Sequence, residues 1–291
     1  MSEDQTPPAA PSSPTLTAAE HTEAGGAPSS GQRRFGTFAG VFTPSVLTIL
    51  GVIMYLRVGW VTGQAGLLGA ILIILLAHLI TIATGLSVSS IATNREVGAG
   101  GAYNIISRSL GAPAGAAIGI PLFLAQALSV AFYIVGFTES VQVFLGGLGV
   151  QLSIAAGKAI SSVLLVLLCA MSARSAALAI KAQYVVMAAI GLSLLAIFSG
   201  GSSAPPTELQ WTGAGTESFS VVFAVFFPAV TGIMAGVGMS GDLKNPRRSL
   251  PIGTMSAIGV GLVVYLALPV WLAMNVSSEE LVNDNYILWQ L

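Results

Sequence analysis

Charged side chains are scarce in this sequence. Asp, Glu, Lys and Arg make up only 8% of its 291 residues, against roughly 25% in a soluble domain, and 54% of the residues are hydrophobic. The mean hydropathy of +0.84 is correspondingly high. These values exclude an ordinary soluble domain and predict an integral membrane protein whose surroundings are the lipid bilayer. A formal net charge of -1 leaves no basic surface for nucleic acid, which is excluded as a partner.

Cysteine is nearly absent as well. Cys169 is the one cysteine of the sequence, so no internal disulfide and no paired-cysteine metal motif can form. The glycine-rich run at 98–101 follows an apolar segment and lacks the Lys-Ser/Thr pair of a phosphate-binding loop. No pattern points to a hydrolase, a redox enzyme or a prosthetic group. We therefore predict that the protein is not an enzyme and needs no cofactor.

Long apolar runs dominate what is present. A helix needs about 20 apolar residues to cross the hydrocarbon core, because no water is available there for unpaired backbone groups. Seven stretches qualify, and they predict an all-α transmembrane domain over residues 35–274. These stretches cover residues 39–60, 67–87, 113–143, 151–172, 178–199, 219–239 and 253–274.

The two ends of the chain differ from this domain. Residues 1–34 are rich in Pro, Ala, Ser, Thr and Gly without apolar periodicity, and such a segment cannot bury enough surface to offset its ordering entropy. We predict a disordered cytoplasmic tail there, and not a signal peptide, because no apolar core follows a basic start. Residues 275–291 are expected to begin an extracellular loop at which the chain is truncated. Since many transporters consist of two inverted repeats, five helices plus two would be a first repeat and the start of a second.

Basic residues predict the orientation, because they collect on the cytoplasmic side of membrane proteins. With the amino terminus inside, all of the 11 Lys and Arg residues except Arg57 and Lys158 fall in or beside cytoplasmic segments. We therefore predict a multi-pass protein of the plasma membrane with a cytoplasmic amino terminus.

Two of the predicted spans share an interruption. Residues 42–53 of the first span and 226–236 of the sixth both run Pro, then Thr, then Gly, then a bulky apolar pair. Proline removes a backbone donor and glycine tolerates unwound torsions, so both helices are predicted to open near the midplane. Matched interruptions of this kind mark the binding sites of many transporters. The alternative is that these residues serve only close packing or a kink.

The interrupted spans hold no carboxylate. Glu139 is the only acid inside a predicted span, and it lies toward the outer end of the third. Freed carbonyls can coordinate a cation, and the amides at the start of a half-helix can hold an anion. A lone cation bound by dipoles would be uncompensated in a low dielectric. A cation carried together with an anion fits this pattern, and so does a neutral or zwitterionic solute.

Several runs of the sequence resemble the cation-chloride cotransporters, a group within the amino acid-polyamine-organocation superfamily. The runs are Gly51-Val52-Ile53, Gly63-Gln64-Ala65-Gly66, Ser90 to Asn94, Gly100 to Tyr103, Ile106 to Gly111, Phe226 to Gly236 and Ser240 to Leu243. The resemblance implies a LeuT-like inverted-repeat transporter fold, truncated here to about seven transmembrane helices with helices 1 and 6 broken. It also implies electroneutral symport of potassium and chloride, with or without sodium, and a homodimer when the protein is full length.

The resemblance further implies ion sites at the two interruptions. The potassium ligands would be the carbonyls of Thr48, Ile49 and Pro228 and the hydroxyls of Tyr133 and Thr231. One chloride would lie near the amides of Gly51, Val52 and Ile53, and a second near those of Gly232, Ile233 and Met234. A sodium site would use carbonyls near Leu47 and Leu50, with hydroxyls from an eighth helix that this sequence does not contain.

The chain departs from the family at Thr48, where asparagine is usual. Because this position would contribute mainly a carbonyl, the resemblance implies that the change is tolerated. Leu50 together with residues 51–53 is typical of the potassium-chloride branch, whereas residues 63–66 are typical of the sodium-potassium-chloride branch. These patterns leave the branch open.

Other features have competing interpretations. The charged residues after the sixth span form either a positively charged cytoplasmic loop or an inner gate, and they are Asp242, Lys244, Arg247 and Arg248. Tyr103 is either a gate residue or a packing residue. His78 is expected to be a hydrogen-bonded structural residue, with a proton-linked role as the alternative. The rival function is an amino acid permease on the same scaffold. The permeases resemble one another in a Gly-x-Gly break in the first helix, whereas residues 48–51 hold one glycine.

Overall fold

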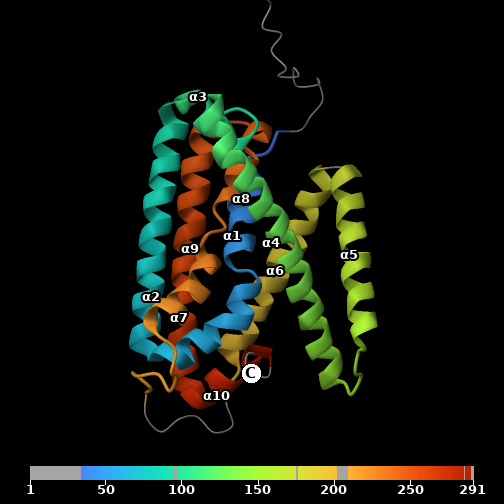
Figure 1. Ribbon diagram of the computed structural model, residues 1–291, viewed down its shortest axis with the longest axis vertical. Coiled ribbons are helices and arrows are strands. Elements are labelled where there is room, and N and C mark those ends of the chain that lie inside the picture. Colours follow the sequence, from blue (N-terminus) through green and yellow to red (C-terminus); the bar gives the residue numbers. More distant parts are fainter. Residues whose placement is uncertain (1–33, 95–96, 175, 202–208, 285, 290–291) are drawn as a thin grey trace, which may run out of the picture. The chain divides into compact units, whose positions relative to one another are not determined.

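The computed structural model describes residues 34–94, 97–174, 176–201, 209–284 and 286–289 (Figure 1). The disordered tail predicted over residues 1–34 therefore lies outside the described residues, apart from Arg34. Within these ranges the elements are helical, and the β-type contact is an isolated parallel bridge between Phe35 and Leu243. The predicted all-α class is confirmed.

The α-helices follow a short π-helix, η1 Phe38–Phe42. They are α1 Thr43–Ile49, α2 Val52–Asn94, α3 Gly101–Leu110, α4 Ala112–Gly147, α5 Ile154–Arg174, α6 Ala176–Ser199, α7 Phe219–Phe226, α8 Met234–Gly238, α9 Pro246–Asn275 and α10 Ser278–Asn283. Three 3-10 turns complete the described part, namely η2 Phe227–Val230, η3 Ser240–Asp242 and η4 Ile287–Trp289.

Among the described residues, 6 helical segments are long and apolar enough to cross a membrane. The first, Phe38–Asn94, covers two of the predicted stretches. Gly66 separates them, because it interrupts α2 with the non-helical torsions φ 69° and ψ 176°. The other segments coincide with the remaining predicted stretches to within seven residues at either end. The chain is thus a multi-pass membrane protein by the length and composition of its helices.

The turn at Gly66 is held by the segment that precedes α7. The Ala214 amide donates to the Gly63 carbonyl over 3.0 Å, and the Glu217 amide donates to Gln64 Oε1 over 3.2 Å. A Cβ on Gly66 would lie 2.6 Å from the Trp211 carbonyl oxygen, and a side chain is also disfavoured by the positive φ. The run Gly63 to Gly66 therefore has a structural role in closing the turn between two spans.

The first predicted interruption is present, but Pro44 does not cause it. Pro44 lies in the first turn of α1, directly after the π-helix η1, and the chain stays helical through it. The helix instead ends at Ile49, and Leu50 adopts φ -88° and ψ 40°. Beyond this point the Met54 amide donates to the Gly51 carbonyl over 3.0 Å as α2 begins. The opening thus lies at Leu50 and Gly51.

The second interruption is also present. After α7 the chain tightens into the 3-10 turn η2, which contains Pro228, and residues 231–233 are not helical. The helix resumes at Met234 as the short α8. The two halves have different neighbours, because α7 packs on α2 whereas α8 packs on α1 and α9 (Figure 1). The prediction that helices 1 and 6 are broken is confirmed.

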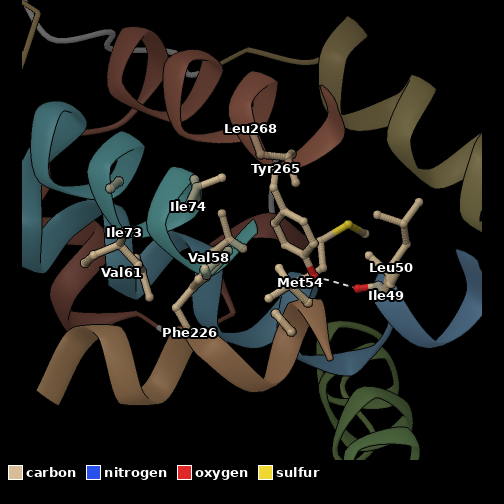
Figure 2. Packing of buried hydrophobic residues seen from close by; sticks show 14 of the residues in the cluster. Ile49, Leu50, Met54, Val58, Val61, Ile73, Ile74, Phe226, Tyr265 and Leu268 are labelled. Carbon is tan, nitrogen blue, oxygen red and sulfur yellow. Dashed lines mark hydrogen bonds between the residues drawn. The ribbon is translucent and has the colours of Figure 1, made fainter. Parts of the chain in front are cut away.

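The main hydrophobic core lies beside the first break. Helices α2 and α9 make the most extensive contact in the described part, and α7 packs on α2. Figure 2 shows Tyr265 of α9 in this core, pointing toward Ile49 at the end of α1. In contrast, α4, α5 and α6 leave most of their apolar side chains exposed, as suits helices that border lipid.

Candidate functional site

The two interruptions meet at Thr48 and Gly232. The Thr48 hydroxyl donates to the Gly232 carbonyl over 2.7 Å, and it is also 2.9 Å from the Pro44 and Ser45 carbonyl oxygens. A Cβ on Gly232 would lie 2.6 Å from the Thr48 Cβ, so only glycine allows this approach. Thr48 thereby contributes more than the carbonyl that its position was expected to supply.

A second contact fixes the first break from the opposite side. The Tyr265 hydroxyl donates to the Ile49 carbonyl over 2.7 Å, and the Tyr265 side chain is fully buried. Ile49 is the last residue of α1, so its carbonyl has no intrahelical donor. Sequence reasoning missed Tyr265, because one tyrosine in a continuous apolar span carries no motif.

Tyr133 covers the break from α4. An added Cβ on Gly51 would lie 3.3 Å from Tyr133 Cε1, so the phenol ring rests against the unwound backbone. The Tyr133 side chain is 36% exposed, and it borders a cavity of about 660 Å³. Of the predicted site residues, the cavity wall contains Leu47, Thr48, Leu50, Gly51, Val52 and Tyr133.

This cavity has mostly apolar walls with a few hydroxyls. Tyr55 of α2 and Ser193 of α6 both line it, and their side chains are hydrogen-bonded to each other. Ser140 of α4 lies on the same wall. The cavity is therefore lined on one side by hydroxyl-bearing residues of α2, α4 and α6 and on the other by the unwound backbone of the first break.

The predicted residues of the second break do not line this cavity. The Thr231 side chain is exposed, and its hydroxyl donates to the Pro228 carbonyl over 2.8 Å. Ile233 is buried, with 3% of its side chain exposed. The Ala235 amide donates to the Gly232 carbonyl over 3.2 Å where α8 begins. The structure thus joins the two predicted halves through Thr48 and Gly232, and not through one shared wall.

Two more hydrogen-bonding groups hold the region between α2 and the second break. The Thr81 hydroxyl donates to the Val230 carbonyl over 3.2 Å, just before the unwound segment. His78, one turn earlier, is buried, and its Nδ1 is 2.9 Å from the Ile74 carbonyl oxygen. The His78 ring centroid lies 6.0 Å from that of Tyr265. One ring nitrogen of His78 is thus hydrogen-bonded as expected for a structural residue, whereas Nε2 is buried without a hydrogen-bond partner among the described residues.

The predicted gate residues fall into separate groups. The Phe35 amide donates to the Asp242 carbonyl over 2.8 Å, and the Lys244 amide donates to the Phe35 carbonyl over 2.9 Å. Arg247 and Arg248 lie in the first turn of α9, after its N-cap Asn245. Tyr103 packs separately against α4, where a Cβ on Gly119 would lie 2.9 Å from its ring. The contact between the amino-terminal segment and residues 242–244 is thus made by backbone.

The polar segment predicted as an extracellular loop forms a short helix, α10. Its N-cap Ser277 accepts a hydrogen bond from the Glu280 amide, and the Glu280 carboxylate accepts one from the Ser277 amide. The helix packs against α2, with Leu281 buried beside Gly59 and Gly63.

Comparison with known proteins gives one family match. The family described as amino acid permease matches residues 40–288. The chain is 37% identical over 277 residues to solute carrier family 12 member 2 of Homo sapiens, an alignment that covers 89% of this chain and 23% of that protein. It is 35% identical over 271 residues to human solute carrier family 12 member 1, covering 87% of this chain and 25% of the relative.

A more distant vertebrate relative gives a similar result. Over 311 residues the chain is 32% identical to solute carrier family 12 member 9 of Danio rerio, with 90% of this chain and 34% of the relative covered. The chain therefore spans about a quarter to a third of the length of these relatives. All are named as solute carriers, so the chain is related to transport proteins and not to enzymes, as the sequence predicts.

Proposed function

The chain belongs to the amino acid permease family and is related to solute carrier family 12, the cation-chloride cotransporters, and from this premise we propose that it carries part of an electroneutral potassium-chloride symport site. One observation carries the proposal. Two membrane helices lose their regular winding and meet where Thr48 donates to Gly232. The backbone groups released by these breaks can bind ions of opposite sign without any carboxylate.

The cation site of this proposal lies at the carboxyl end of α1. The last carbonyls of a helix have no intrahelical partner and carry the negative end of the helix dipole. In this proposal Thr48 and Ile49 supply such carbonyls, and Tyr133 supplies a phenol beside Gly51. The Pro228 carbonyl and the Thr231 hydroxyl would add oxygens from the second break. Neutral oxygens of this kind suit a weakly hydrated cation such as potassium.

The anion sites of the proposal lie at the restarting half-helices. The first amides of a helix lack intrahelical acceptors and carry the positive end of the dipole. The amides of Gly51, Val52 and Ile53 at the start of α2 would hold one chloride close to the cation. Those of Gly232, Ile233 and Met234 would hold a second chloride. The two charges offset each other in the low dielectric of the membrane.

In this proposal the protein also transports sodium only if another helix supplies hydroxyl ligands for it. Leu47 and Leu50 border the cavity beside the first break, where their carbonyls would contribute. We infer that sodium dependence is decided by residues of other helices in the full-length protein.

The proposal also includes a location and an orientation. We propose the plasma membrane, with the amino terminus in the cytoplasm. The backbone pairing of Phe35 with residues 242 and 244 supports this orientation. It places the segment after Arg34 beside Lys244 and the start of α9, and basic residues collect on the cytoplasmic side. We propose that the full-length protein is a homodimer, in line with the resemblance to the cotransporters, and that residues 242–248 with Tyr103 close its inner side.

Amino acid transport is the second candidate, because the matching family is named for amino acid permeases. In a permease the first break would receive a substrate carboxylate. Here Tyr133 rests on Gly51 and Thr48 bonds to Gly232, so side chains already contact the backbone that would receive it.

The test compares the two cargoes in cells that express the full-length protein. We expect saturable uptake of radiolabelled rubidium that falls to background when gluconate replaces chloride. Uptake of labelled amino acids should not exceed that of cells without the protein. Rubidium uptake that ignores chloride, together with saturable amino acid uptake, would favour the permease.

A further inference from the structure

Tyr265 is a fully buried side chain that contacts the first break and is not among the predicted ion ligands. Its hydroxyl reaches from the middle of α9 to the Ile49 carbonyl, across 216 residues of sequence, over 2.7 Å (Figure 2). A carbonyl oxygen has two lone pairs. The Tyr265 hydroxyl occupies one of them, so a cation in the proposed site would use the other.

The same face of α9 also holds the Ile49 side chain. A Cβ on Gly261, one turn before Tyr265, would lie 2.6 Å from Ile49 Cγ2. Residues four apart on a helix lie on one face. Gly261 and Tyr265 therefore contact both the side chain and the carbonyl of the last residue of α1, and they fix where that carbonyl points.

The Tyr265 ring is itself fixed on two sides. Phe226, at the end of α7, packs edge-to-face on it with centroids 5.2 Å apart and an interplanar angle of 86°. His78 of α2 lies on another side at 6.0 Å. Since Phe226 immediately precedes η2 and the second break, one tyrosine contacts helices that lead into both interruptions.

We propose that Tyr265 is a positioning residue that sets the affinity and selectivity of the cation site by holding the Ile49 carbonyl. This inference rests on the proposed function, because it assumes that the Ile49 carbonyl faces the transported cation. A carbonyl held at a fixed position favours a cation of matching size. Without the hydroxyl, the Ile49 carbonyl would lose its restraint and discrimination between large and small cations would weaken.

The test is Tyr265→Phe in the full-length protein, which removes only the hydroxyl. We expect the KM for rubidium to rise about tenfold, the size of one lost buried hydrogen bond, while the maximal rate per surface molecule is retained. The preference for rubidium over lithium should fall, and the KM for chloride at saturating rubidium should not change. A merely structural role would lower the maximal rate and leave both the rubidium KM and the ion preference intact.

Two further variants complete the test. Tyr184→Phe removes a hydroxyl from α6, where Tyr184 stacks on Phe38, and should behave as the wild type. Phe226→Leu keeps the Tyr265 hydroxyl but removes its supporting ring, so it should raise the rubidium KM by a smaller factor. This variant decides the case if Tyr265→Phe does not reach the membrane.

The outcomes separate this inference from the proposed function. Wild-type protein without chloride-dependent rubidium uptake overturns both. Normal wild-type uptake with a rubidium KM within about twofold of wild type in Tyr265→Phe, or in Phe226→Leu if only that variant reaches the membrane, overturns the role of Tyr265 alone.

Discussion

The Thr48 hydroxyl donates a hydrogen bond of 2.7 Å to the Gly232 carbonyl, and this contact joins the two broken helices at the centre of the proposed site. Thr48 lies one residue before the end of α1, and Gly232 lies in the non-helical segment before α8. A movement of one break that keeps this hydrogen bond would have to shift the other. In the proposed mechanism this contact couples the cation end of α1 to the anion end of α8.

Removal of this hydroxyl should weaken that coupling. Thr48→Val keeps the branched shape but removes one of the two donors to the Gly232 carbonyl, since the Ala235 amide remains, and this loss should cost roughly 1 kcal/mol of stability. We expect lower rubidium uptake per surface molecule and a higher chloride concentration for half-maximal uptake. Thr48→Ser should restore both quantities. Chloride titrations of rubidium uptake measure the effect. Equal chloride curves for Thr48→Val and wild type would contradict the coupling.

Space at Gly232 gives a prediction for stability. An alanine Cβ there would lie 2.6 Å from the Thr48 Cβ and 2.9 Å from the Thr48 carbonyl carbon, closer than packed atoms allow. Overpacking of this kind costs about 1–3 kcal/mol. Gly232→Ala should therefore lower the unfolding temperature of the detergent-purified protein.

The matched control is Gly259→Ala in α9, where nothing lies within 4 Å of the added Cβ. Because alanine favours a helix over glycine, this variant should be as stable as wild type or slightly more stable. A Gly232→Ala protein as stable as the Gly259→Ala protein would show that the two breaks are farther apart than described.

Tyr133 gives a prediction for affinity. Its ring rests against Gly51, so Tyr133→Phe should preserve the packing and remove one oxygen from the proposed cation site. We expect the KM for rubidium to rise by at least about tenfold, the range for loss of a polar contact to a charge. The KM is obtained from initial uptake rates over a rubidium series. An unchanged value would remove Tyr133 from the site.

A substitution at Thr231 should change transport while it leaves stability almost unchanged. Its side chain is exposed and its hydroxyl bonds only to the nearby Pro228 carbonyl among the described contacts, so Thr231→Ala should change stability by no more than about 0.5 kcal/mol. The KM for rubidium should nevertheless rise, and Thr231→Ser should restore it. If alanine and serine variants transport alike, the hydroxyl is not a ligand.

The sequence predicted where the helices break but not what holds the breaks. Small and proline residues at 44–51 and 228–232 predict a loss of regular winding, because they weaken the helix locally. The cause is less local than the pattern indicates: Pro44 is accommodated in the first turn of α1, and the opening lies at Leu50 and Gly51.

Contacts between distant segments were beyond prediction. Tyr265 bonds to Ile49 only because α9 packs along α1, and no periodicity within residues 253–274 indicates it. The role of Gly66 was hidden for the same reason, since the segment that contacts it begins more than 140 residues later. The gate residues are a further example. Their charge predicted a side of the membrane, but it did not predict that Asp242 and Lys244 pair with Phe35 through backbone hydrogen bonds.

The most direct test of paired ion binding uses the purified full-length protein in liposomes. Rubidium uptake would be measured with and without internal and external chloride, at zero and at inside-negative membrane potential. The proposed mechanism predicts uptake that requires chloride and is the same at both potentials, because each cation moves with an anion. Chloride-independent uptake that increases at negative potential would contradict it.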